Sequence, residues 1–181
     1  LYIDSSGSMP SPTQESPALL AGTILVLSVL GGGGRVRVTS FSGPGQVAGD
    51  LGFTRQRDVA MRMLLTYFGG GTTFPLDLLA ARYARPPATT TGPEARQHLV
   101  VLSDEGLSSF FGTGQTEFEG VASAVRAKLD TGTLMVMDAT RTIGESAANT
   151  GYDVEYLDSM NETPAACARL AARLAKVGLR G

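Results

Sequence analysis

Short apolar runs occur along the chain at the intervals expected of buried β-strands. The first comprises residues 1–3, and two more lie within residues 99–102 and 132–140. Continuous apolar runs of this length are typical of strands that are buried on both faces, as in a parallel sheet. Residues 35–41 alternate polar with mostly β-branched apolar side chains, which predicts a further strand. A last strand is predicted at residues 152–158.

Between these strands, the hydrophobic spacing changes to that of helices. The predicted helices cover residues 18–30, 55–68, 75–85, 116–129, 141–151 and 162–178. Residues 46–53 could form a short second arm that makes an edge hairpin with the preceding strand. Residues 86–96 and 106–115 are rich in polar residues and glycine and are predicted to be loops.

Several predicted helix ends carry recognisable signals. Four glycines at residues 31–34 stop the first helix. Thr116 and Glu119 have the spacing of a capping box. Thr163 precedes Pro164 and is predicted to be the N-cap of the last helix.

The alternation of strands and helices predicts the fold class. Buried strands joined by helical crossovers form an open, mostly parallel sheet with helices on both faces, a three-layer Rossmann-like α/β architecture. In such folds, ligands bind outside the carboxyl ends of the strands, where the strand order reverses. Residues 1–181 are predicted to form a single domain. The chain lacks an initiator methionine and its first strand is short, so we expect it to be cut from a longer protein.

Composition and charge restrict the classes of function. The chain is 43% hydrophobic and 18% charged, and its net charge is −2, which favours a soluble globular domain without general attraction to nucleic acid or an anionic membrane. The longest apolar stretch, residues 18–30, is too short to span a bilayer, and no signal peptide is visible. The single cysteine excludes an intramolecular disulfide and a zinc cluster, and it suits a reducing compartment.

Carboxyl and hydroxyl side chains follow the ends of two predicted buried strands. Asp4, Ser6 and Ser8 come directly after the first strand, and Asp104 ends the strand in "VVLSDEG". A glycine run brings Thr72 to the start of a helix at the same end of the sheet. If the two strands are neighbours, these oxygens meet in one crevice. The set contains neither sulfur nor imidazole, so it suits a hard divalent cation such as Mg²⁺, with a coordination position left open.

These motifs resemble those of von Willebrand factor A-type domains. "DSSGS" fits the D-x-S-x-S pattern of the family's metal-ion-dependent adhesion site, "GGGTTFPLDLL" is similar to its glycine-rich loop, "VVLSDEG" to its fourth strand and "VRVTSFSG" to its second strand. The site motifs occur in the family's order, and the resemblance covers nearly the whole chain. It implies a six-stranded sheet with one antiparallel edge strand and a bound Mg²⁺ or Mn²⁺.

The resemblance assigns the metal ligands by motif position. They are Asp4, Ser6, Ser8, Thr72 and Asp104. Thr72 directly follows the glycines and is preferred to Thr73 on register. The family often has glycine after the last aspartate, whereas this chain has Glu105, an extra carboxylate that bears on affinity and ligand choice.

The function implied by the resemblance is metal-dependent protein binding, without enzymatic activity. A partner's Asp or Glu would occupy the open position on the cation, and the surface around it would set specificity. Intracellular members of the family often work with AAA+ ATPases of the MoxR type. The single cysteine, the lack of a visible signal and the Arg/Ala/Gly-rich composition favour a bacterial, cytoplasmic member of this kind. Neither a nucleic-acid partner nor membrane insertion is expected.

Other interpretations of the same residues stay open. A metal-assisted hydrolase or phosphoryl-transfer enzyme would use Asp4 as nucleophile or metal ligand, although Ser6 stands where a two-aspartate phosphatase needs a second carboxylate. The cation could be purely structural, or the motif could consist only of turn and cap residues. Nucleotide binding would need Lys-Ser/Thr after a glycine run, and neither run has it. His98, the only histidine, is predicted at the wrong end of its strand for a general base.

Four further residues have alternative or simpler assignments. Phe110 and Phe111 either pack into the core or form an apolar wall beside the metal. Asp138 is either a turn residue or a charge close to the site. Cys167 is predicted to be a small core residue.

Overall fold

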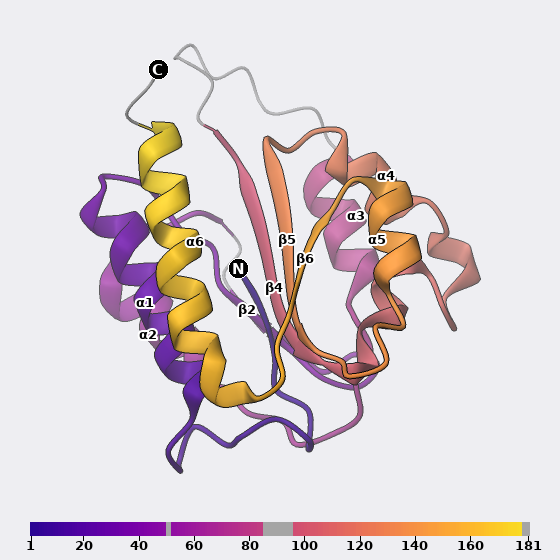
Figure 1. Ribbon diagram of the computed structural model, residues 1–181, viewed down its shortest axis with the longest axis horizontal. Helices are drawn as coiled ribbons and strands as arrows, with labels where there is room; N and C mark the ends of the chain where they lie inside the picture. The colour runs from indigo at the N-terminus through magenta and orange to yellow at the C-terminus, as the bar shows by residue number, and fades with distance from the viewer. Residues whose placement is uncertain (50–51, 85–95, 179–181) are drawn as a thin grey trace.

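A six-stranded sheet in the order β3-β2-β1-β4-β5-β6 forms the centre of the molecule (Figure 1). The computed structural model describes residues 1–49, 52–84 and 96–178 of the 181-residue chain. The strands are β1 (Tyr2–Asp4), β2 (Thr39–Phe41), β3 (Val47–Gly49), β4 (His98–Asp104), β5 (Thr131–Met137) and β6 (Asp153–Tyr156). Neighbouring strands are parallel except for β3, which pairs antiparallel with β2 at one edge. The predicted fold class is therefore confirmed.

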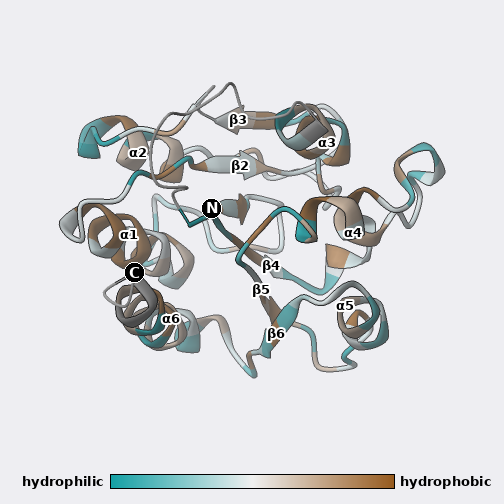
Figure 2. Cartoon of the chain, turned by 90° about the horizontal axis from the view of Figure 1, so that it is seen from above, coloured by the Kyte–Doolittle hydropathy of each residue, from teal (hydrophilic) through white to brown (hydrophobic). Residues whose placement is uncertain are grey.

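Helices cover both faces of this sheet (Figures 1 and 2). The α-helices are α1 (Pro17–Gly31), α2 (Arg57–Leu64), α3 (Leu76–Ala84), α4 (Val121–Arg126), α5 (Gly144–Thr150) and α6 (Thr163–Gly178). Three 3₁₀ turns are η1 (Glu105–Phe111), η2 (Thr116–Phe118) and η3 (Met160–Glu162). The helices α1, α2 and α6 lie on one face, and α3, α4 and α5 lie on the other.

The central strands contribute to both cores because their side chains alternate between the two faces. In β1, Ile3 packs into the core beneath α1 and α6, whereas Tyr2 packs into the core beneath α3 and α4. In β4, Leu102 and Val101 divide in the same way. Burial on both faces explains why these strands are continuous apolar runs in the sequence.

An aromatic cluster fills the second core. The Phe74 ring lies 4.9 Å from Tyr2, 5.1 Å from Phe41 and 4.7 Å from Phe110, measured between ring centroids. Phe110 is fully buried, and Phe111 packs partly buried against the same cluster. Of the two alternatives for these phenylalanines, packing into the core is therefore the correct one.

The edge hairpin is confirmed, but the predicted strand at residues 35–41 is shorter than expected. β2 begins only at Thr39 and pairs with β3. Val36 instead forms an isolated antiparallel bridge with Thr54, through two backbone hydrogen bonds of 3.0 and 2.7 Å. The predicted loop at residues 86–96 lies outside the described residues except for Arg96, and Arg85 lies outside them as well.

Two predicted helix N-termini were wrong because the preceding residues are already in helical or turn conformations. Gly120 has φ = 82°, so the helix predicted from Thr116 begins at Val121, after the separate turn η2. Thr163 has helical dihedral angles because η3 runs directly into α6, and its hydroxyl donates to the Met160 carbonyl instead of capping the helix.

Two other predicted segments differ from the structure near the carboxyl ends of the strands. The helix predicted over residues 55–68 ends at Leu64, because the backbone N–H groups of Phe68 and Gly69 donate to the Ser5 carbonyl at 3.3 and 2.9 Å. The loop predicted at residues 106–115 begins as the 3₁₀ helix η1. Both differences bring backbone close to the end of β1 or β4.

Replacement of Phe74 by alanine tests the packing of the second core. We expect Phe74→Ala to lower the free energy of unfolding by about 3–5 kcal/mol, because the fully buried ring leaves a cavity. Urea denaturation followed by circular dichroism measures this. Phe53 is 49% exposed, and Phe53→Ala should change the free energy of unfolding by less than about 1 kcal/mol. Equal losses in both variants would contradict the assigned core.

Candidate metal centre

The predicted site residues lie at the point where the strand order reverses. The chain passes from β1 to β2 on one side and returns from β3 to β4 on the other, and β1 pairs in parallel with both β2 and β4. The strand ends Asp4 and Asp104 therefore lie at the same edge of the sheet. The loops that follow them gather at the lower end of the molecule in Figure 1.

Asp4 is the most buried carboxylate of the site, with 2% of its surface exposed. Its Oδ1 accepts a hydrogen bond from the Ser6 backbone N–H at 2.8 Å. Its Oδ2 accepts one from the Ser103 hydroxyl at 2.6 Å and a longer one from the Thr72 hydroxyl at 3.4 Å. The carboxylate is thus held by three segments that are far apart in the sequence.

The two serines of the first loop lie next to each other. The Ser6 and Ser8 hydroxyl oxygens are 3.2 Å apart, with Ser6 buried and Ser8 exposed. Hydroxyl hydrogen bonds are most often about 2.7–2.8 Å long. The contacts at Ser6–Ser8 and Thr72–Asp4 are longer than that. A hydroxyl oxygen has two acceptor lone pairs, so these oxygens keep acceptor capacity for a further ligand.

Backbone hydrogen bonds fasten the glycine loop against the first loop. The Gly7 N–H donates to the Gly70 carbonyl at 2.7 Å. The Ser42 hydroxyl donates to the Gly71 carbonyl at 2.9 Å, and the Thr73 N–H donates to the Ser42 carbonyl at 2.8 Å. These bonds flank Thr72 on both sides, and the Thr72 hydroxyl donates to Asp4.

Asp104 enters the site from β4. It is 5% exposed and caps η1, with Oδ1 accepting from the Gly106 N–H at 3.4 Å. Gly106 lies directly against Thr72, since a Cβ at Gly106 would be 2.4 Å from the Thr72 Cβ. Glu105 is exposed. The structure therefore joins Thr72 and Asp104 through Gly106, a contact that sequence analysis did not identify.

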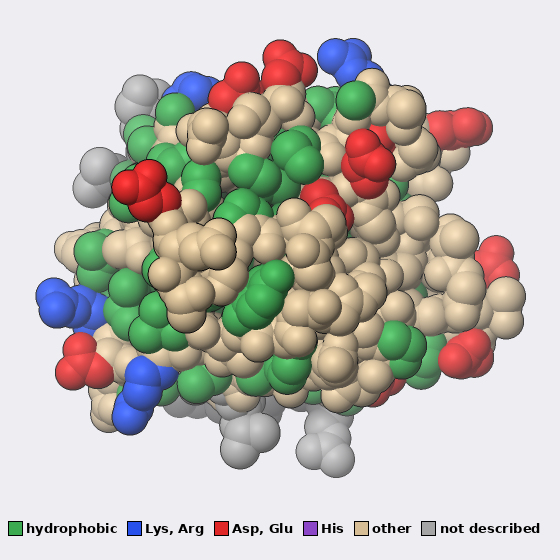
Figure 3. Space-filling model, turned by 90° about the horizontal axis from the view of Figure 1, so that it is seen from below, with side chains coloured by type: hydrophobic (Ala, Val, Ile, Leu, Met, Phe, Trp, Pro, Cys, Tyr) green, Lys and Arg blue, Asp and Glu red, His purple; other side chains and the backbone are tan. Residues whose placement is uncertain are grey.

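The electrostatics of the site favour a cation. Burial raises the pKa of the Asp4 carboxyl, hydrogen bonds from Ser103 and Ser6 oppose that rise, and the charge of Asp104 adds to it. Neither Asp4 nor Asp104 forms an ion pair with a described Lys or Arg. Viewed from this end, Lys and Arg side chains lie only toward the margins, among uncharged, apolar and acidic residues (Figure 3).

The donor set fits a hard divalent cation and no softer metal. In the part of the chain that the structure describes, no group of three or more His, Cys, Asp or Glu side chains could hold a metal ion. The site offers two carboxylates and three hydroxyls, which suit Mg²⁺ or Mn²⁺ together with water. Ser103 was not predicted, although its place directly before Asp104 in a buried strand marked a polar side chain in need of a partner.

The other residues singled out in the sequence have structural roles. Asp138 is buried and accepts hydrogen bonds from the N–H and hydroxyl groups of Thr140 and Thr142, so it is a turn residue. Burial alone would raise its pKa, but these bonds outweigh burial and lower it. Cys167 is fully buried in the core, where burial raises its pKa to about 12. His98 begins β4, at the end of the sheet opposite the site.

Of the comparisons with known proteins, only the one with solved structures gives matches. No protein-family model and no curated protein matches the chain. A crystal structure of an aerotolerance-related membrane protein from Bacteroides fragilis NCTC 9343, with multiple mutations to serines, matches with a TM-score of 0.53 and 13% identity, over 95% of this chain and 96% of that chain. At this identity the likeness shows the fold alone. Within residues 1–49, 52–84 and 96–178, no helix has the length and apolarity that crossing a membrane requires.

Substitution of Asp4 by asparagine tests the buried charge. Since the native pKa of Asp4 is raised, the native state binds more protons than the unfolded state above pH 3.8, and stability falls as pH rises through that region. We therefore expect metal-free Asp4→Asn to be more stable than wild type at neutral pH, with the difference shrinking toward pH 3.8. Urea denaturation in EDTA at several pH values measures this. A variant that is less stable at neutral pH would show that its neighbours stabilise the charged form.

Proposed function

We propose that this chain is a divalent-metal-dependent protein-binding module. Its metal would be Mg²⁺ or Mn²⁺. The proposed ligands, directly or through water, are Asp4, Ser6, Ser8, Thr72 and Asp104. An Asp or Glu carboxylate of a partner protein would complete the coordination shell.

The observation that carries the proposal is the convergence of oxygens from three loops on Asp4. Thr72 contacts Asp4 at 3.4 Å, Ser6 hydrogen-bonds Asp4 through its backbone N–H and its side chain, and Ser8 lies 3.2 Å from the Ser6 hydroxyl. The charge of Asp104 acts on Asp4 from the adjacent strand. A turn that served only to cap a helix would need no oxygens from the glycine loop or from β4.

The chain's own residues would do most of the positioning. Ser103 orients the Asp4 carboxylate through its 2.6 Å hydrogen bond, and Gly106 supports Thr72 by close contact. When bound, the metal would supply a positive centre that accepts a carboxylate. Because Ser8 is exposed, the cluster can be reached from solvent at this end of the sheet.

The partner class follows from the chemistry and from the family resemblance. Two buried carboxylates with one divalent cation are neutral overall, and an incoming carboxylate would find an open position on the metal. An intracellular complex with a MoxR-type AAA+ ATPase is the partner that the resemblance favours. That part of the proposal, and the cytoplasmic location that goes with it, rests on the resemblance and the composition.

A metal-assisted hydrolase is the alternative with the same oxygens. Ser6 lies where a second catalytic carboxylate would be needed, and the one histidine is at the far end of β4. Both observations favour the binding module. Hydrolysis of a generic phosphate ester that disappeared in Asp4→Ala would favour the enzyme instead.

Thermal unfolding with and without metal tests the site. At about 100 times its dissociation constant, a bound metal stabilises the native state by roughly 2.7 kcal/mol, a rise in Tm on the order of 5–10 °C for a domain of this size. We expect this rise for wild type in Mg²⁺ or Mn²⁺ relative to EDTA, and none for Asp4→Ala. An equal rise in Asp4→Ala would place the metal elsewhere.

A pair of glycine substitutions tests the geometry around Thr72. Gly106→Ala should displace Thr72 and weaken Mg²⁺ binding by about 10–100-fold, as measured by calorimetry. Gly71 is adjacent to Thr72 in sequence, but a Cβ there would meet nothing within 4 Å, so Gly71→Ala should bind nearly as wild type does. Unchanged binding in Gly106→Ala would remove Thr72 from the ligand set. Circular dichroism of both variants confirms that they are folded.

Partner capture separates binding from a purely structural cation. With a metal-dependent module, proteins retained by the immobilised chain in Mg²⁺ should be released by EDTA and should not be retained by Asp4→Asn. Retention that survives chelation, in a chain whose Tm still depends on metal, would make the cation structural.

A further inference from the structure

Helix α1 carries large apolar side chains on its outer side as well as on the side that packs on the core, which is unusual for a helix at the surface. None of its 15 residues is charged. Leu20 and Leu27 are 53% and 42% exposed, although the opposite side of the helix packs on the core. A helix that is hydrophobic all round is normally buried on all sides. The outer side of α1 therefore lacks a covering element within the described chain.

The outward positions of α1 follow the spacing of a helix-pairing seam. They are Leu20, Ile24, Leu27 and Gly31, at intervals of four, three and four residues. Leu20, Leu27 and Gly31 are exposed, as is Ser28 beside them, and Ile24 is half-buried and also contacts the core. This 3.5-residue repeat is the one that keeps a seam facing a second helix. Ala168 and Ala172 of the neighbouring α6 are also exposed, and these small side chains leave room for an approaching helix.

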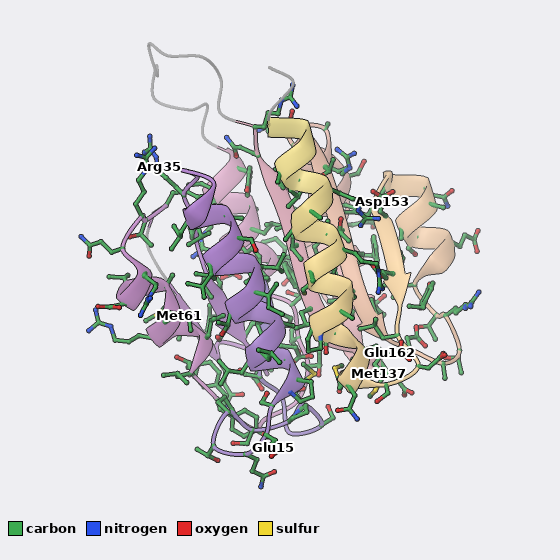
Figure 4. All side chains as sticks on the ribbon, turned by 60° about the vertical axis from the view of Figure 1, so that its left-hand side comes forward. Glu15, Arg35, Met61, Met137, Asp153 and Glu162 are labelled. Carbon is green, nitrogen blue, oxygen red and sulfur yellow. The ribbon has the colours of Figure 1, made fainter. Side chains whose placement is uncertain are left out.

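Charges of opposite sign lie beyond the two ends of the uncharged helix. Glu15 precedes α1 and Arg35 follows it, and both are exposed. Figure 4 shows Glu15 beyond the amino end of α1 and Arg35 beyond its carboxyl end. An identical helix laid antiparallel on α1, about 22 Å long, would bring each Glu15 to the Arg35 of the other copy. A parallel arrangement would instead put like charges together.

We propose that α1 is a homodimer interface in which two copies of this chain pair their α1 helices antiparallel about a two-fold axis near Thr23 and Ile24. Leu20 packs against the partner subunit's Leu27, and Leu27 packs against the partner subunit's Leu20, so the contact is self-complementary. Glu15 pairs with the partner subunit's Arg35 at each end. The interface lies on the outer side of a helix layer, and the proposed metal centre lies at the edge of the sheet, so the two proposals are independent.

Sedimentation equilibrium of the 181-residue chain tests the dimer. At roughly 100 µM, a dimer with a dissociation constant of about 10 µM is the main species. We expect wild type to be dimeric under these conditions, and Leu20→Asp and Leu27→Asp to be monomeric while keeping the wild-type circular dichroism spectrum. Phe53→Asp is the control, because Phe53 is similarly exposed and lies outside α1, in the segment that follows β3. A monomeric wild type, or dimers unaffected by the leucine changes, would overturn the proposal.

A charge exchange tests the antiparallel arrangement. Glu15→Arg and Arg35→Glu should each weaken the dimer by about tenfold, because each creates two like-charge contacts. The double variant should restore wild-type affinity. Glu15→Arg combined with Arg62→Glu, on the exposed surface of α2, should not restore it. Single changes without effect, or a double variant that stays weak, would overturn the antiparallel pairing even if the leucines proved essential.

Discussion

The buried Asp4 carboxylate is the constraint on which the rest of this end of the molecule depends. A carboxylate that is 2% exposed needs hydrogen-bond donors, because a buried charge without partners is strongly destabilising. The donors are the backbone N–H of Ser6 after β1, the hydroxyl of Ser103 in β4 and the hydroxyl of Thr72 after the glycines. They meet only because β1 pairs in parallel with β4 and because Gly7 and Ser42 tie the glycine loop to its neighbours. The arrangement of the site therefore depends on the strand topology.

The hydrogen bonds at Asp4 differ in length, and the difference separates two roles. The Ser103 bond of 2.6 Å is short and fully buried, as expected for a group that fixes the carboxylate in place. The Thr72 contact of 3.4 Å and the Ser6–Ser8 contact of 3.2 Å are long for hydroxyl hydrogen bonds. The Thr72 hydroxyl lies beside Asp4, and the Ser6 and Ser8 hydroxyls lie beside each other in the loop that follows Asp4. Their arrangement suits a third group placed between them, and the uncompensated charge of Asp4 and Asp104 gives that group a positive sign.

The sequence was sufficient to predict the fold class and the placement of Asp4 and Asp104 at the carboxyl ends of the neighbouring strands β1 and β4. Each depends on strong local signals: apolar runs buried on both faces, and polar residues directly after them. The helix starts at Thr116 and Thr163 were predicted wrongly, because Gly120 and η3 override the capping patterns. Ser103 and Gly106 were missed, since each matters through a residue far away in sequence. Thr72 leaves no room for a Cβ at Gly106, and the spacing of apolar residues in the sequence does not predict such a contact.

Two places in the chain depart from what a stable isolated domain requires, and they differ in kind. At the carboxyl ends of β1 and β4, two carboxylates lie buried without a described cationic partner, so positive charge is lacking there. On α1, leucines face outward from a helix without charged residues, so apolar surface is left uncovered there. Local rules are broken mainly where an interaction with another species restores them. A cation would compensate the buried negative charge, and a second apolar surface would cover the exposed leucines. The proposed metal centre and the proposed dimer interface thus follow from the same reasoning applied to different physical terms.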